Sequence, residues 1–140
     1  MCEHTAHLHL PPGTLAPAAA RRGTRRVLAG WNLHDPDWLD QAEIVVTELV
    51  TNAIRHGGGC LQLALTAVHG AVTVSVADRS ATPPQLRDPD DEGGVGLHIV
   101  DAYTTGWGVG NHSAGKWVWA TLPPCPTTPA RPHQACDERQ

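Results

Sequence analysis

Two side chains in the segment 48–57 have the types and the spacing to hold a cation. Glu48 and Asn52 stand four residues apart, and Arg55 follows three residues later. Side chains four apart on a helix lie one above the other on the same face. Carboxylate and carboxamide oxygens are ligands that hard divalent cations such as Mg²⁺ prefer. On these residues alone, a solvated helix face with a hydrogen-bonded pair is the commoner explanation.

The helix that carries this pair is predicted from the apolar residues on its other face. Asp35 and Pro36 are typical of a helix start, with Asp35 as the N-cap, and the glycines at 57–59 end the helix after His56. Between these limits, apolar residues recur at helical spacing and predict a buried face. They are Trp38, Ala42, Val45, Val46, Leu49 and Ala53.

Two further segments have residue types suited to nucleotide binding. An apolar strand runs directly into Asp78, whose carboxylate could accept a hydrogen bond from an exocyclic amine such as that of adenine. A turn-initiating aspartate is the alternative. The glycines at 93, 94 and 96 open a helix, where backbone N–H groups and the helix dipole attract phosphates, although a hinge would use the same residues. No Gly-Lys-Ser/Thr follows, so this segment is not a P-loop.

The remaining elements must position these three segments. We expect strands over 4–10, 60–68, 71–77, 106–110 and 116–122, and helices over 16–30, 35–56 and 95–102. Strands joined as hairpins, with helices between them, predict an α+β fold. It would be a two-layer α/β sandwich whose mostly antiparallel mixed sheet is covered by helices on one face. A long Pro-rich, acidic loop would cover 80–94.

Composition and charge limit the classes of function. A formal charge of −4 argues against a general nucleic-acid binder. Apolar runs fall far short of the ~20 residues of a membrane span, and we expect no signal peptide. The four cysteines show no C-x-x-C spacing, which favours reduced thiols and a cytoplasmic protein. We expect one domain over 1–123 and a disordered Pro-rich tail over 124–140.

Histidine and tryptophan clusters at the ends of the chain also have simple explanations. His4, His7 and His9 could be a metal-binding tract, but their spacing fits no closed zinc pattern. We expect His7 and His9 to line the exposed face of an edge strand. The three tryptophans of the last hairpin are predicted to pack on the sheet. They are Trp107, Trp117 and Trp119.

In their order along the chain, these segments resemble the nucleotide-binding boxes of the GHKL (Bergerat-fold) ATPase superfamily. The resemblance is closest to its small single-domain branch of anti-sigma-factor serine/threonine kinases. Segment 48–57 matches the N box of that branch, 78–80 its first glycine box and 94–100 its second. The hairpin over 107–120 also matches. The similarity extends from about Thr5 to Pro123.

The resemblance implies a histidine kinase-like ATP-binding domain that uses ATP and Mg²⁺. Asn52 would ligate Mg²⁺ at the ATP phosphates, and Glu48 would be the catalytic general base. Asp78 would hydrogen-bond the adenine amino group. The other nucleotide-binding residues implied by the matching boxes are Arg55, His56, Gly94, Gly96 and Leu97.

The implied activity is that of a protein serine/threonine kinase that phosphorylates an anti-sigma-factor antagonist and sequesters a sigma factor. Self-association of the chain into a homodimer is a further possible interaction. Val95 stands where the small branch often carries Arg, and the acidic run 88–92 adds like charge near the phosphates. These departures favour the alternative, a non-catalytic nucleotide-sensing or interaction module that regulates a partner. The catalytic fragment of a sensor histidine kinase is disfavoured, because the sequence before Thr5 offers no phosphoacceptor hairpin.

Overall fold

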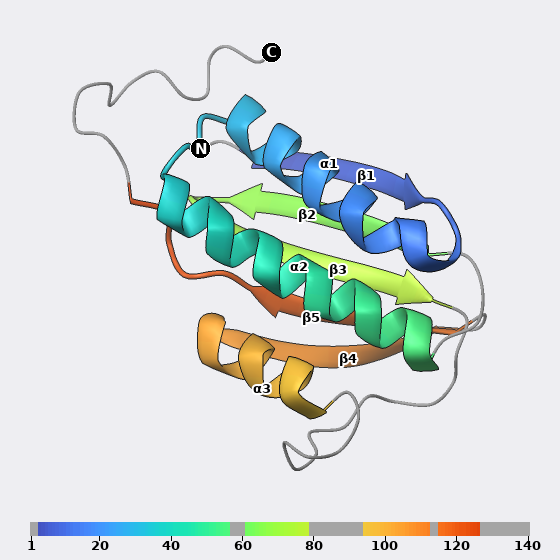
Figure 1. Cartoon of the computed structure of the whole chain (residues 1–140). Helices are drawn as coiled ribbons and strands as arrows, with labels where there is room; N and C mark the ends of the chain where they lie inside the picture. Colours follow the sequence, from blue (N-terminus) through green and yellow to red (C-terminus); the bar gives the residue numbers. More distant parts are fainter. Residues whose placement is uncertain (1–2, 57–60, 79–93, 113–114, 127–140) are drawn as a thin grey trace.

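Five strands form one sheet in the computed structural model of the chain, which describes residues 3–56, 61–78, 94–112 and 115–126. The strand order is β1-β2-β3-β5-β4, and every neighbouring pair is antiparallel (Figure 1). The strands are β1 (Glu3–Leu10), β2 (Leu61–Val68), β3 (Ala71–Asp78), β4 (Gly106–His112) and β5 (Gly115–Thr121). The predicted α+β fold is therefore confirmed, with boundaries within about two residues of those expected.

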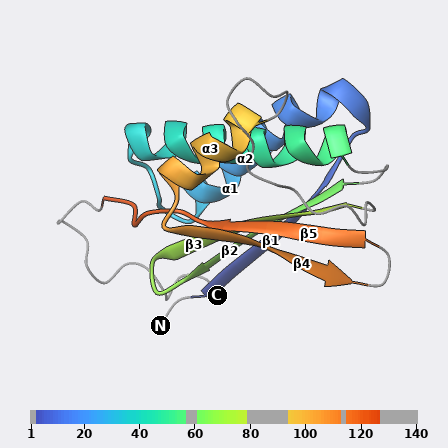
Figure 2. The same cartoon turned by 90° about the horizontal axis from the view of Figure 1, so that it is seen from below.

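Three helices cover one face of this sheet and leave the other face bare (Figure 2). They are α1 (Ala16–Gly30), α2 (Pro36–His56) and α3 (Gly94–Tyr103), and a 3-10 turn, η1 (Gly13–Leu15), precedes α1. The strands alternate accordingly, because successive side chains point to opposite faces. The row of β3 that faces the helices, Val72, Val74 and Val76, is at most 1% exposed.

Local residue types explain where the elements turn. Between β2 and β3, His69 and Gly70 both have positive φ, 55° and 82°, which suits a two-residue hairpin loop. At the end of α1, Asn32 has a φ of 68°, and the Leu33 N–H donates to the Leu28 carbonyl at 3.0 Å. This 6→1 bond is the Schellman helix ending. It turns the chain directly into α2.

The start of α2 is held by two contacts. As predicted, Asp35 caps the helix, because its Oδ2 accepts a hydrogen bond from the Trp38 N–H at 2.9 Å. The Trp38 indole N–H donates to the Pro123 carbonyl at 2.7 Å, so the helix start is tied to the chain after β5. Cys125 follows there and is 8% exposed within the core; burial raises the pKa of its thiol. Of the tail predicted to be disordered over 124–140, residues 124–126 are described and include this buried cysteine, and 127–140 lie outside the described residues.

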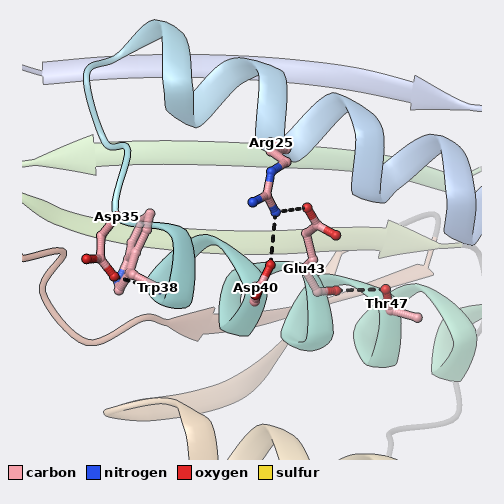
Figure 3. A network of polar contacts seen from close by, with 6 residues as sticks. All are labelled: Arg25, Asp35, Trp38, Asp40, Glu43 and Thr47. Carbon is pink, nitrogen blue, oxygen red and sulfur yellow. Dashed lines mark hydrogen bonds and ion pairs between the residues drawn. The ribbon is translucent and has the colours of Figure 1, made fainter.

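An ion-pair cluster joins α1 to α2 (Figure 3). The Arg25 guanidinium of α1 contacts Glu43 and, at 3.3 Å, Asp40, both on α2. The hydrogen bond with Glu43 raises the pKa of Arg25 above its ordinary value. Solvent screens such partly exposed ion pairs and makes their contribution to stability small, so their main effect is orientation. They direct the Glu43 side of α2 towards α1.

The edge strand β1 exposes His7 and His9, as predicted, while His4 faces the helices and stacks on Trp31 at a ring-centroid distance of 5.1 Å. Across the described residues, no group of three His, Cys, Asp or Glu side chains could hold a metal ion. The predicted packing of the last tryptophans is seen at Trp119, whose ring lies over Gly108. Within the same ranges, no helix is both long and apolar enough to cross a bilayer.

Thr24 of α1 is fully buried, and its hydroxyl has no hydrogen-bond partner. We predict that Thr24→Val increases the free energy of unfolding by about 1 kcal/mol, because valine keeps the shape and removes an unsatisfied polar group. Urea denaturation measures this change. Thr47→Val is the matched control, since the Thr47 hydroxyl donates to the Glu43 carbonyl at 2.7 Å. The control should not stabilise, and destabilisation by Thr24→Val would contradict the prediction.

Candidate functional site

The three segments singled out in the sequence converge on one end of the sandwich. The C-terminus of α2 and the C-terminus of β3 lie at the same end, and the N-terminus of α3 is directed towards it (Figure 1). Helix α2 packs against both β3 and α3. Strand β3 is the central strand of the sheet.

Asn52 occupies a position that the helical pattern assigns to the core. It follows Leu49 by three residues and Val45 by seven, so it continues their buried stripe. Its side chain is 7% exposed, while Val45 and Leu49 are 0% and 1% exposed. A buried carboxamide costs free energy unless its polar atoms are hydrogen-bonded or bind a ligand. Asn52 is thus the polar residue of an otherwise apolar stripe.

The helical period also shows which neighbour this part of α2 faces. At about 100° per residue, the nine-residue step from Glu43 to Asn52 turns about 180° around the axis. Glu43 contacts Arg25 of α1, and α2 lies between α1 and α3 (Figure 1). Asn52 is therefore on the side of α2 that faces α3.

Glu48 lies one turn before Asn52 on this same side. Its side chain is half-buried, at the margin between the core and solvent, whereas Arg55 is exposed one turn further on. Along one face of α2 the structure therefore places a half-buried carboxylate, a buried carboxamide and an exposed guanidinium. His56 is the last residue of α2, and its side chain lies outside the described part of the structure.

The other predicted site residues are placed by their backbone alone. Asp78 is the last residue of β3 and pairs in register with Lys116 of β5. Gly94 is the first residue of α3, and Gly96 and Leu97 belong to the same first turn. The predicted loop over 80–94 lies, except for Gly94, outside the described residues, together with the rest of the first glycine box.

The C-terminal half of α3 makes two hydrogen bonds that were not predicted from the sequence. Val100 is fully buried, and its carbonyl accepts a hydrogen bond from the Thr104 hydroxyl at 2.7 Å. The Trp107 indole N–H of β4 donates to Asp101 Oδ1 at 3.2 Å. Helix α3 packs mainly against α2, and the Asp101–Trp107 bond adds a contact with β4.

The arrangement combines two opposite electrostatic preferences. Oxygen ligands on α2 attract a hard cation, and the N-terminus of α3 attracts an anion through its N–H groups and its dipole. A magnesium-bound polyphosphate carries both charges. The donor set of Glu48 and Asn52 therefore fits such a group, with Asn52 as the more deeply buried of the two oxygen donors.

A polar residue in the buried stripe of α2 should lower the free energy of unfolding, and binding of a ligand explains why such a residue is present. We predict that Asn52→Leu increases the free energy of unfolding by about 1 kcal/mol in the absence of ligand, because leucine is apolar and of similar volume. Urea denaturation measures this. Leu49→Asn, the reverse change one turn earlier, should instead cost more than ~3 kcal/mol. A loss of stability in Asn52→Leu would show that the carboxamide is structural.

Comparison with known proteins gives one family. The sequence profile of the histidine kinase-like ATPase domain matches residues 13–122, which include most of the described elements. Among solved structures, the chain is similar to the histidine kinase AdeS of Acinetobacter baumannii, with a TM-score of 0.48 and 16% sequence identity. That alignment covers 84% of this chain and 66% of the other. No curated protein sequence matches the chain.

Proposed function

Because the chain belongs to the histidine kinase-like ATPase domain family, within the GHKL superfamily, we propose that it binds Mg-ATP and thereby regulates a partner protein. The observation that supports this most strongly is the burial of Asn52 in an apolar stripe beside the half-buried Glu48. Such a residue is explained by a ligand rather than by folding. The ATP-binding domain would extend over 1–123.

Each site residue has a distinct role in this proposal. The side-chain oxygen of Asn52 would hold Mg²⁺, and Asp78 would accept a hydrogen bond from the adenine amino group. The first turn of α3, with Gly94, Gly96 and Leu97, donates backbone N–H groups to the phosphates. Arg55 and His56 border the pocket. Bound Mg²⁺ supplies charge neutralisation on the phosphates, which with positioning is most of what phosphoryl transfer requires.

Phosphorylation of a protein is the finer part of the proposal. The Glu48 carboxylate lies at the solvent margin of the site, where a substrate hydroxyl can approach and give up its proton. The substrate would be the serine or threonine of an anti-sigma-factor antagonist, and a sigma factor would be the regulated partner. Cytoplasmic location and self-association into a homodimer belong to the same proposal.

The second candidate function is a nucleotide-sensing module without turnover. Val95 in the second glycine box supplies no cation to the phosphates, so charge compensation during transfer would be weaker than with an arginine. This candidate shares the ATP site and differs only in whether Glu48 performs chemistry.

Calorimetric titration with Mg-ATP tests the binding proposal. We predict that the wild type binds, and that Asp78→Asn and Asn52→Leu each weaken binding at least tenfold, about 1.4 kcal/mol. These changes remove the adenine contact and the cation ligand, respectively. Gln62→Ala is the control, because Gln62 belongs to the bare face of the sheet, where it contacts His7. An absence of heat in the wild type would refute ATP binding.

Single-turnover measurement with labelled ATP and a candidate antagonist tests the kinase proposal. We predict that Glu48→Gln keeps Mg-ATP affinity within about threefold but reduces phosphate transfer about 100-fold or more, because only the general base is lost. If the wild type binds ATP and transfers phosphate no faster than Glu48→Gln, the sensing module is the correct function.

A further inference from the structure

The cations of this chain are concentrated on one helix. Four of its ten Lys and Arg residues stand on two successive turns of α1, at positions 21, 22, 25 and 26. Helix α1 contains no acidic residue, although the chain as a whole has a formal charge of −4. Helix α1 is therefore positively charged, whereas the chain as a whole is negatively charged.

Only one of these arginines is neutralised within the described residues. Arg25 contacts Asp40 and Glu43 of α2, whereas no ion pair is found there for Arg21, Arg22 or Arg26. Arg22 and Arg26 are exposed, and Arg21 is half-exposed. The acidic residues of α2 thus stabilise the inner edge of the cluster and leave its outer part available to a partner.

The arrangement has no advantage for the helix itself. Positions 21 and 25, and 22 and 26, are like-charged pairs at i and i+4, which destabilise a helix. Cations favour a helix in its last turn, near the negative end of the dipole, but the last turn of α1 has no basic residue. A reason for the cluster must therefore be sought outside the fold.

An exposed apolar side chain lies on the same stripe. Leu15, at the junction of η1 and α1, is 67% exposed. Its backbone is already helical, with φ −80° and ψ −18°, so steps of seven and four residues bring Leu15, Arg22 and Arg26 onto one face. An apolar anchor beside unpaired guanidinium groups is the composition of a protein-binding surface, in which Arg is enriched.

We propose that this arginine face, made of Leu15, Arg22 and Arg26, binds an acidic segment of a partner protein that also carries apolar side chains. Guanidinium groups match carboxylates with paired hydrogen bonds, and Leu15 requires an apolar contact. A nucleic acid is disfavoured because the acidic remainder of the chain repels a polyanion. This inference deepens the proposed regulatory role. The choice of a protein as the partner rests on that proposed function, whereas the position of the surface follows from the residues of α1 alone.

The arginine face is separate from the proposed ATP site. Helices α1 and α3 lie on opposite sides of α2 (Figure 1), and the site residues of α2 are on the α3 side. Substitutions on α1 should therefore change partner binding while Mg-ATP affinity stays the same. This separation allows each proposal to fail without the other.

The test uses fluorescence anisotropy with a labelled amphipathic peptide of about 20 residues made of Glu and Leu at helical spacing. We expect the full-length protein to bind it, and Arg22→Glu/Arg26→Glu to weaken binding at least tenfold. Arg131→Glu/Arg139→Glu changes the net charge equally and should have less than about a twofold effect. Leu15→Ser should weaken binding to a smaller extent. The same peptide with Gln in place of Glu should bind at least tenfold less tightly.

Three results would overturn the inference: no binding by the wild type, an equal loss in the Arg131/Arg139 control, or tighter binding of a DNA duplex than of the acidic peptide. Circular dichroism checks that the charge-reversed helix still folds, and Arg22→Gln/Arg26→Gln replaces that variant if it does not. Mg-ATP titration of every variant separates this result from the proposed function. Loss of ATP affinity in the α1 variants would show that the two surfaces are not independent.

Discussion

The structure depends on the burial of α2 across the centre of the sheet. Its stripe of apolar side chains includes Val45, Val46 and Leu49, all at most 1% exposed, and fully burying each such side chain contributes about 1.5–3 kcal/mol. The helix start is held by the Asp35 cap and by the bond from Trp38 to Pro123. The described residues of the proposed nucleotide site belong to this helix, to β3 beneath it or to α3 beside it.

Burying a polar side chain in the core-facing stripe of a helix costs free energy. The presence of Asn52 in such a stripe therefore needs an explanation. Glu48 needs no special explanation, because a half-buried carboxylate at a helix margin is ordinary. Asn52 does, since it replaces one member of a core stripe. Proteins accept such local losses of stability at sites where a ligand satisfies the polar group. The position of Asn52 opposite α3, rather than its residue type alone, connects it with the phosphate-attracting helix terminus.

The two sides of α2 have different partners and therefore different roles. On one side, Glu43 and Asp40 neutralise Arg25 of α1 and leave the outer arginines of that helix unpaired within the described residues. On the other side, Glu48 and Asn52 face α3, which packs against α2 and contacts β4 through the Asp101–Trp107 hydrogen bond. One helix thus supports both the proposed nucleotide site and the proposed partner surface, without either requiring the other.

The sequence by itself determined the local structure: the three described α-helices and the five described strands, the Asp35 cap, the exposure of His7 and His9 and the placement of Glu48 and Asn52 on one helical face. These features follow from helical and strand periods and from cap and turn residues, which act over a few positions. Strand order, the burial of Asn52, the direction of α3 and the pairing of Arg25 were decided only by the tertiary structure. They depend on contacts such as Trp38 with Pro123 and Arg25 with Glu43, between residues far apart in the sequence, and no local period encodes these contacts.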